Sequence, residues 1–220
     1  WIKEIDINPL LATPEGCWAL DARIVQHPES RTEAQLPRLA IRPYPSQYTW
    51  SAAAGNGAPV TLRPIRPEDE PQMVKFHGTL SAQTVYHRYF SALQLSQRID
   101  HERLARICFN DYDCEMALVA ERKGGADGES EILGVARLNR HRHSRTAEFS
   151  VLISDQYQKR GLGTEMLEKL LLIAKAEGIG KVVGYILPDN QGMQQVCRKL
   201  GFKLSPMKED RLVKAEILVG

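Results

Sequence analysis

The chain changes its pattern of hydrophobic and polar positions near residue 59. From residue 60 onward apolar residues recur with regular periods, whereas residues 26–58 have few periodic apolar positions and many Pro, Ser, Arg and Gln residues. Strict alternation indicates a strand, and the helical repeat indicates an amphipathic helix. We therefore predict a linker at residues 26–58, with an extended segment near residues 39–48, and a folded domain at residues 59–220.

The folded domain is predicted to contain strands and helices in a mixed order. The strands are expected at residues 60–65, 115–121, 132–138, 146–153, 181–187, 202–204 and 212–219, with a glycine-rich loop at residues 124–128. The helices are expected after Pro67, after the capping residue Ser81, over residues 100–109, after Gly161 and over residues 190–200. The prediction is an α+β fold: a mixed, mostly antiparallel sheet flanked by helices, with a β-α-β unit near its end.

Residues 1–25 form a separate pattern of two short strands around a turn at Pro14 and Gly16. A hairpin of this size does not bury enough surface to be stable alone. Because the chain begins at Trp1, inside a strand-like run, we interpret its start as the cut end of a longer protein.

Charge and hydropathy restrict the classes of partner. The formal net charge of +2 over 220 residues gives no reason to expect binding to nucleic acid or to an anionic membrane. We identify no apolar stretch of membrane-spanning length and no signal peptide. We therefore expect a cytoplasmic protein.

The cysteines and histidines do not have the spacing of a metal site. None of the four cysteines belongs to a CxxC pair, and we interpret them as reduced thiols: Cys17, Cys108, Cys114 and Cys197. His141 and His143 flank Arg142, but no third ligand follows nearby. We interpret this segment as a solvated basic turn and expect no metal.

The most informative stretch is Gln-Lys-Arg-Gly-Leu-Gly-Thr at residues 158–164, between a predicted strand and an amphipathic helix. A helix start leaves backbone N–H groups unpaired and concentrates positive potential. Gly161 and Gly163 allow close approach of a ligand, and Lys159, Arg160 and Thr164 add charge and donors. This arrangement suits a pyrophosphate. The alternative is a turn that merely needs glycine, which a GxG alone would favour. Neither a nucleotide P-loop nor the dinucleotide fingerprint is present.

Residues 151–164 resemble the acetyl-CoA motif of the GNAT superfamily of N-acetyltransferases. Asn190, followed by Gly201 and Phe202, resembles the second element of that family at the matching spacing. The resemblance implies acetyl-CoA as cosubstrate, with the main chain around residue 152 lining the pantetheine and thioester. It implies a binding site made of Val151, Leu152, Ile153, Gln158, Lys159, Arg160, Gly161, Leu162, Gly163, Thr164 and Asn190. Asn is also a preferred helix N-cap, so Asn190 has a structural interpretation beside the functional one.

A closer resemblance covers almost the whole chain. Residues 1–25 resemble the end of an ATP-grasp domain from an ADP-forming acyl-CoA synthetase. Positions matching Asn8 and Asp21 help bind magnesium in intact domains of that kind, but the rest of the domain is absent here, so we expect no nucleotide site. The order of ATP-grasp tail, linker and GNAT domain, and the runs at residues 85–90, 111–119 and 187–190, resemble bacterial protein lysine acetyltransferases. This implies acetylation of protein lysines, typically on AMP-forming acyl-CoA synthetases.

Glu148 is the candidate general base. A lysine ammonium, of pKa about 10.4, must lose a proton before it attacks. Alternation places Glu148, Ser150 and Leu152 on one face of the strand at residues 146–153, and we expect apolar neighbours to desolvate the carboxylate and raise its pKa. From the residues alone, an exposed carboxylate on a solvated face is favoured; the family position favours the base. Glu115 is the second candidate, which we interpret as a surface ion pair with an arginine.

The leaving thiolate and the oxyanion need partners as well. A backbone N–H beside Leu152 or Ile153 is the implied oxyanion donor. Many GNAT members place a tyrosine acid seven residues after the asparagine, where this chain has Cys197. We interpret Cys197 as a core residue, which leaves protonation to water or a thiolate that departs unprotonated.

Three hypotheses of function remain open from the sequence. The first is a protein lysine acetyltransferase, and the second an enzyme that acetylates a small amine or a protein N-terminus. The third is a non-catalytic module that senses acyl-CoA. The acceptor and the oligomeric state are left open.

Overall fold

The computed structural model describes residues 1–32, 35–37, 41–53, 57, 59–124, 130–140, 144–207 and 209–220. Leu39, residues 125–128 of the predicted loop and the segment of His141 and His143 lie outside the described residues. The chain divides into two compact units, Trp1–Ala40 and Ile41–Gly220.

The first unit contains two pairs of antiparallel strands. Strand β1 (Ile2–Ile7) pairs with β4 (Ala22–Gln26), and β2 (Leu10–Thr13) pairs with β3 (Gly16–Ala19). This confirms the predicted hairpin. No residue of these strands is buried, as expected for a ribbon too small to enclose a core.

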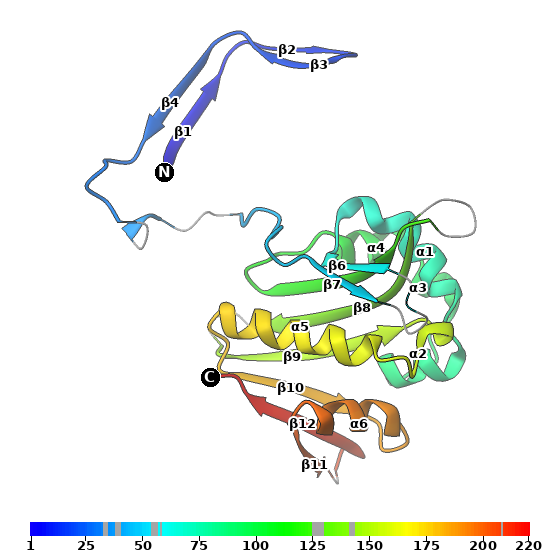
Figure 1. Cartoon of the computed structure of the whole chain (residues 1–220). Helices are drawn as coiled ribbons and strands as arrows, with labels where there is room; N and C mark the ends of the chain where they lie inside the picture. Colours follow the sequence, from blue (N-terminus) through cyan, green and yellow to red (C-terminus); the bar gives the residue numbers. More distant parts are fainter. Residues whose placement is uncertain are drawn as a thin grey trace. The chain divides into compact units, whose positions relative to one another are not determined.

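The second unit is built on an eight-stranded sheet with the order β11-β12-β10-β9-β8-β7-β6-β5 (Figure 1). Its strands are β5 (Trp50–Ala53), β6 (Pro59–Pro64), β7 (Glu115–Arg122), β8 (Glu131–Arg140), β9 (Thr146–Ile153), β10 (Lys181–Ile186), β11 (Lys203–Met207) and β12 (Leu212–Leu218). Neighbouring strands are antiparallel except β9 and β10, which are parallel. The predicted mixed, mostly antiparallel sheet is confirmed.

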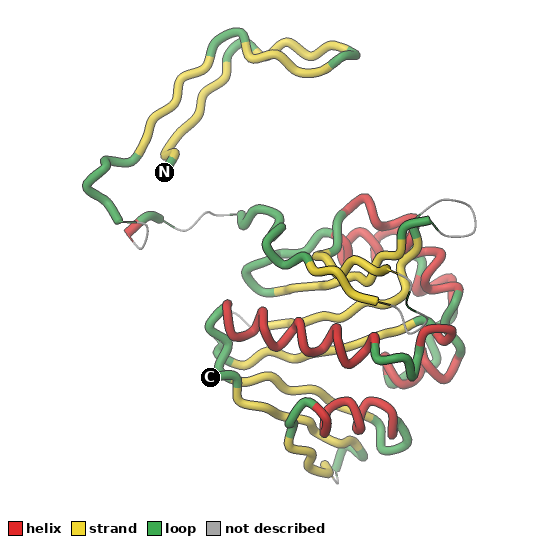
Figure 2. Tube along the Cα trace, in the orientation of Figure 1, coloured by secondary structure: helices red, strands yellow, loops and turns green. Residues whose placement is uncertain are grey.

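Helices flank this sheet on its two faces (Figure 2). Between β6 and β7 lie the short helix η2 (Pro67–Asp69) and then α1 (Glu70–Gly78), α2 (Ala82–Tyr89), α3 (Leu95–Arg98) and α4 (His101–Cys108). The connection from β9 to β10 contains η3 (Asp155–Tyr157) and α5 (Leu162–Ala176), and α6 (Gln191–Lys199) follows β10.

Two hydrophobic clusters pack on opposite faces of the sheet. On β9, Ala147, Phe149 and Ile153 belong to the cluster formed with α5, whereas Leu152 belongs to the cluster formed with α1 and α4. The predicted alternation along this strand is therefore confirmed. It places the side chains of Glu148 and Ser150 on the same face as α1, α2 and α4.

Local signals account for the starts of two helices and the buried face of a third. The side chain of Ser81 accepts a hydrogen bond from the Thr84 backbone N–H and caps α2, and Asp100 caps α4 in the same way. The apolar stripe of α5 is buried from Leu162 to Ala174. Helix α3 was not predicted, because four residues are too few to show a helical period.

The second unit begins before the boundary expected at residue 59. Its edge strand β5 pairs with β6, with Trp50 opposite Leu62. The Arg42 guanidinium donates to the Glu177 carboxylate at 2.8 Å, and the Tyr48 hydroxyl donates to the same carboxylate at 2.7 Å. Residues 41–53 therefore pack onto the sheet unit through one short strand, through polar contacts and through the partly buried side chains of Tyr48, Trp50 and Ala52. This apolar segment is too short to show a clear hydrophobic period in the sequence.

The approach of β10 to β9 depends on a glycine. A Cβ atom at Gly184 would overlap the ring of Phe149, which itself packs edge-on against Phe202 with centroids 5.2 Å apart. Phe149 thus occupies the space that a side chain on β10 would need.

We predict that Gly184→Ala destabilises the sheet unit by about 1–3 kcal/mol, because the methyl group overpacks the core against Phe149. Urea denaturation would measure the free energy of unfolding. Gly78→Ala is the matched control, since nothing lies within 4 Å of its Cβ position. Equal stability of the two variants would contradict the packing account.

Candidate functional site

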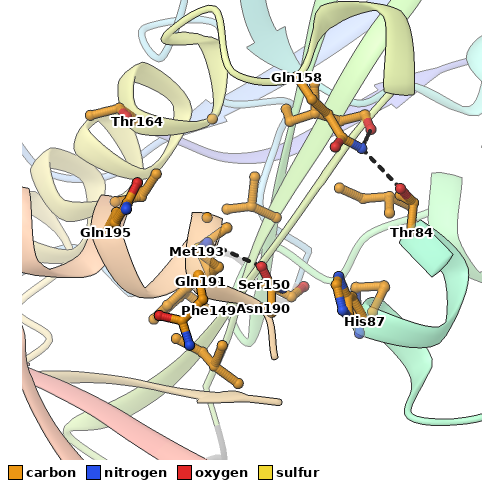
Figure 3. Close-up of a pocket in the computed structure, with 18 of the residues that line it drawn as sticks. Thr84, His87, Phe149, Ser150, Gln158, Thr164, Asn190, Gln191, Met193 and Gln195 are labelled. Carbon is orange, nitrogen blue, oxygen red and sulfur yellow. Dashed lines mark hydrogen bonds between the residues drawn. The ribbon is translucent and has the colours of Figure 1, made fainter. Parts of the chain in front are cut away.

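The parallel strands β9 and β10 separate after a short paired stretch. Thr146, Ala147 and Glu148 pair with β10, whereas β9 remains paired with β8 as far as Ile153. Residues 149–153 therefore present backbone groups with no strand partner on the β10 side. A cavity of about 830 Å³ opens at this point (Figure 3).

The N-terminus of α5 lies at the same cavity. Its N-cap, Gly161, provides no side-chain hydrogen bond. The Glu165 N–H donates to the Gly161 carbonyl at 3.0 Å, so the preceding amides of Leu162, Gly163 and Thr164 have no intrahelical acceptor. These amides and the helix dipole together form a site for a negatively charged group.

The turn that enters α5 needs unusual backbone conformations. Lys159 and Gly161 have φ angles of 58° and 90°. A φ angle of 90° is strained for any residue with a Cβ, so the backbone conformation at residue 161 requires glycine. A Cβ at Gly163 would lie 3.6 Å from Ile153, which is an ordinary contact. The position of the helix end near β9 therefore does not require glycine at residue 163.

The structure brings most of the predicted binding residues to this cavity. Those that line it are Val151, Leu152, Ile153, Gln158, Lys159, Gly161, Gly163, Thr164 and Asn190. Arg160 and Leu162 do not line it. Arg160 is exposed with its guanidinium 5.8 Å from the Tyr157 ring centroid, and the Leu162 side chain is buried in the core. Leu162 faces the site only through its backbone amide.

Asp155 joins the turn before α5 to the start of α2. Its carboxylate accepts hydrogen bonds from the Ser81 backbone N–H at 2.6 Å, the Thr84 hydroxyl at 2.6 Å and the Gln158 amide at 3.2 Å. Burial alone would raise the pKa of Asp155, but the bonds from Thr84 and Ser81 outweigh it and hold the pKa below its usual value. Gln158 also donates to Thr84 at 2.9 Å, as Figure 3 shows.

The walls of the cavity also include residues that the sequence analysis did not single out. Helix α2 contributes Thr84, His87 and Arg88, and the region from β10 to α6 contributes Tyr185 and Asp189. The imidazole Nε2 of His87 lies 3.2 Å from the carboxylate of Asp189, so this pair connects the two walls. The runs at residues 85–90 and 187–190 contain His87 and Asp189, but nothing in either run indicates that the two segments meet.

The chain belongs to the acetyltransferase (GNAT) domain family, whose model matches residues 60–203. An acetyltransferase of Pseudomonas aeruginosa is 27% identical over 153 residues, which are 70% of this chain and 80% of that protein. Acetyltransferase Pat of Mycolicibacterium smegmatis is 28% identical over 141 residues, 64% of this chain and 40% of Pat. The sheet unit is therefore the acyltransferase domain of an enzyme that uses an acyl-CoA.

Solved structures show the same fold. The GNAT domain of S. lividans PAT superposes with a TM-score of 0.70 at 24% identity, covering 80% of this chain and 99% of that one. A cAMP-binding acyltransferase from Mycobacterium smegmatis gives a TM-score of 0.51 at 21% identity over 80% of this chain and 50% of its own. These similarities support the fold assignment of the GNAT domain.

Glu148 lies where the paired part of β9 ends, at the cavity wall of the GNAT domain. Its side chain is exposed, so the burial expected from the sequence is not present. Glu115 lies on β7 and accepts a hydrogen bond from Arg137 at 2.6 Å. This confirms the predicted pairing with an arginine, but Arg137 is buried, so the pair does not lie at the surface. Of the two carboxylates, Glu148 is the one that lines the large cavity.

Asn190 and Cys197 lie in different surroundings at α6. The side chain of Asn190 accepts a hydrogen bond from the Met193 backbone N–H at 3.1 Å and also lines the cavity (Figure 3). Cys197 is fully buried and is absent from the cavity wall; burial raises the pKa of its thiol to about 12. The interpretation of Cys197 as a core residue is confirmed.

Neither a membrane helix nor a metal cluster is found in the part of the chain that the structure describes. Each described helix is too short or too polar to cross a bilayer. No group of three or more His, Cys, Asp or Glu residues there has the arrangement of a metal site.

We predict that Gly161→Ala weakens the binding of CoA to the GNAT domain by about tenfold or more, because the amides at the start of α5 lose their orientation. Isothermal calorimetry would measure the dissociation constant. Gly178→Ala is the matched control: Gly178 also has a positive φ, of 69°, but follows the opposite end of α5. Both variants should lose about 1 kcal/mol of stability. An equal effect of both on CoA affinity would contradict the site.

We predict that Asp155→Asn lowers the stability of the domain by about 1–2 kcal/mol at pH 7, after allowance for partial exposure. Because the folded pKa of Asp155 is lowered, its contribution is present above the unfolded pKa of about 3.9 and is lost as the pH falls through the folded value. Thermal unfolding from pH 7 to pH 3 would measure it. Asp210→Asn, at an exposed turn residue, should show no such pH-dependent difference.

Proposed function

We propose that this domain transfers an acetyl group from acetyl-CoA to lysine side chains of a protein acceptor, with Glu148 as general base. The observation that carries the proposal is the gap between β9 and β10, with an unpaired strand edge along one side and the bare N-terminus of α5 at its end. Such a gap offers backbone hydrogen bonds to an extended amide and an anion site beside them.

The two parts of CoA fit the two parts of the gap. The diphosphate would bind the amides of Leu162, Gly163 and Thr164, with the ammonium of the exposed Lys159 nearby. The pantetheine arm contains amides, which would pair with the free backbone edge at residues 149–153 as an added strand does. The thioester would then lie near Glu148, at the place where the strands meet.

In the proposed reaction the lysine amine attacks the thioester of acetyl-CoA directly, without an acetylated enzyme intermediate. The lysine nitrogen forms a bond to the thioester carbonyl carbon, the carbon–sulfur bond breaks, and the products are an acetamide and CoA thiolate. Before the attack, the lysine ammonium gives one proton to Glu148, either directly or through a water, so that the nucleophile is the neutral amine. The nitrogen gives its second proton to water as the carbon–sulfur bond breaks. The backbone N–H groups near Leu152 are the proposed oxyanion donors. Because Cys197 is buried away from the cavity, the thiolate leaves unprotonated or takes a proton from water.

Two observations support a protein acceptor. Glu148 is exposed at the cavity wall, where the amine of a flexible lysine side chain can reach it from a bulky partner. Acetyltransferase Pat is related over most of the GNAT domain, and the residue runs described above resemble lysine acetyltransferases fused to synthetase-like regions. We propose AMP-forming acyl-CoA synthetases as the acceptor class.

Acetylation of a small amine is the second candidate. An L-methionine sulfoximine/L-methionine sulfone acetyltransferase of Pseudomonas aeruginosa is 32% identical over 84 residues, which are 36% of this chain and 49% of that protein. This relative acts on small amino acids, as its name states. Competition between a lysine peptide and L-methionine sulfone for acetyl-CoA would separate the two candidates.

We predict that Glu148→Gln lowers kcat by about 10²- to 10⁴-fold through loss of the base, while calorimetry finds the same affinity for acetyl-CoA. Release of free CoA from acetyl-CoA and a lysine peptide would measure the rate. Glu168→Gln, at an exposed position of α5, is the matched control and should retain full activity. A mutant that keeps the wild-type rate would remove Glu148 from the mechanism; binding of acetyl-CoA without turnover in the wild type would favour a sensor.

A further inference from the structure

A second cavity, of about 220 Å³, lies beside the large one on the α1–α4 side of the sheet. The two cavities share Arg88, Ser150 and Leu152 as lining residues. Because Glu148 is on the same face of β9 as Ser150 and Leu152, the small cavity adjoins the proposed position of the reacting amine.

The small cavity gathers positive charge from three separate elements. Arg88 comes from α2, Arg103 from α4 and Arg137 from β8. The one carboxylate among its lining residues is Glu115, which binds Arg137 at 2.6 Å. Three guanidinium groups against one carboxylate leave a positive excess in a partly desolvated space, which is costly without a further anion.

Neither Arg88 nor Arg103 forms a direct ion pair with an acidic side chain among the residues that the structure describes, although the negative charge of Glu148 attracts Arg88. Arg88 forms no side-chain hydrogen bond or ion pair there, and the Nε of Arg103 is buried without an acceptor. Their guanidinium carbons lie 5.1 and 5.2 Å from the ring centroid of Tyr89. This aromatic contact orients both groups and leaves their N–H donors available.

His77 adds a buried, unpaired polar group. It lines the same cavity and is 1% exposed, and both ring nitrogens lack a hydrogen-bond partner in the described part of the chain. Burial, followed by repulsion from Arg98, Arg103 and Arg137, lowers its pKa to about 4, so the ring is neutral at pH 7. A neutral imidazole has one N–H to donate, and an oxygen of a ligand would accept that bond.

We propose that this cavity binds a carboxylate group that the acceptor carries near the amine to be acetylated. The planar donor fork of arginine matches a carboxylate in geometry and charge. A two-residue step along β9 spans about 6.6 Å, so a carboxylate beside Ser150 and an amine beside Glu148 fit within one small molecule or one short peptide. The proposal rests on the proposed acetyl transfer and specifies its substrate class.

The carboxylate can come from two sources, which two pairs of acceptors distinguish. The first pair is a lysine peptide with glutamate beside the lysine and the same peptide with glutamine. The second pair is L-methionine sulfone and its carboxamide. We expect kcat/KM at saturating acetyl-CoA to be about 10- to 100-fold higher for the carboxylate member of at least one pair, because charge-assisted hydrogen bonds to the carboxylate contribute a gain of this size. The pair that shows the preference identifies the source.

Arg103→Gln tests the cavity, because Arg103 lines the small cavity and not the large one. It should abolish the preference while kcat/KM for the uncharged acceptor and the affinity for acetyl-CoA stay within about twofold. Arg106→Gln is the matched control on the same helix, since Arg106 points outward with an 81% exposed side chain. The stability of Arg103→Gln should equal or exceed that of the wild type, because the cation removed has no acidic partner among the described residues.

Equal loss of activity on both members of a pair in Arg103→Gln, or no preference in the wild type, would overturn the inference. Equilibrium binding of fluorescent versions of the two peptides in the presence of CoA provides a readout without turnover. Preferential binding of the glutamate peptide through Arg103 without acetylation would refute the proposed reaction and keep the carboxylate site. Equal rates of acetylation for the two members of both acceptor pairs would refute the carboxylate site and keep the proposed reaction.

Discussion

The functional geometry of this domain depends on the short pairing of β9 with β10. Three residue pairs hold the two parallel strands together, and beyond Glu148 they diverge while β9 stays paired with β8. A fully paired sheet would satisfy every backbone group of β9 and leave no room for a ligand. The ring of Phe149, the first residue of β9 beyond this pairing, packs directly against Gly184 of β10.

The α5 connection converts this gap into a site for a charged ligand. A crossover between parallel strands places the N-terminus of its helix beside the carboxyl end of the first strand. Here the helix begins with glycine in place of a capping side chain, and the amides that a cap would satisfy remain available. The Asp155 carboxylate holds this turn to the start of α2 through Ser81 and Thr84. This carboxylate therefore joins the turn before α5 to α2, and both elements line the large cavity.

Polar groups without partners on the α1–α4 face have a cost to stability. His77 and the Nε of Arg103 are buried without hydrogen bonds in the described residues, and each such group costs about 1–3 kcal/mol relative to a paired one. By contrast, Arg63 lies between the carboxylates of Asp69 and Glu121 at 2.7 and 2.9 Å. The same domain thus pairs a buried arginine fully at one place and leaves the Nε of Arg103 without an acceptor at the small cavity. Such a difference is typical of a site that a ligand completes.

The local secondary structure of this protein could be predicted from its sequence. The bounds of β9, the caps Ser81 and Asn190 and the glycine turn at Gly161 follow from residues close to one another in the chain, because dihedral preferences and capping bonds act over a few positions. The family motifs also lie within such segments. The resemblance of residues 1–25 to an ATP-grasp tail stays a prediction, although their strand pairing is confirmed.

Only the tertiary structure decides which distant segments meet. The exposure of Glu148, the His87–Asp189 pair and the meeting of Arg88, Arg103 and Arg137 depend on the order of strands in the sheet and on the helices that cover it. The edge strand β5 was not predicted because its four residues are too few to show an alternating pattern, although Trp50 and Ala52 pack against the core. The burial and the charged neighbours of a side chain depend on which distant segments pack around it. The local pattern of hydrophobic and polar residues does not show which segments these are.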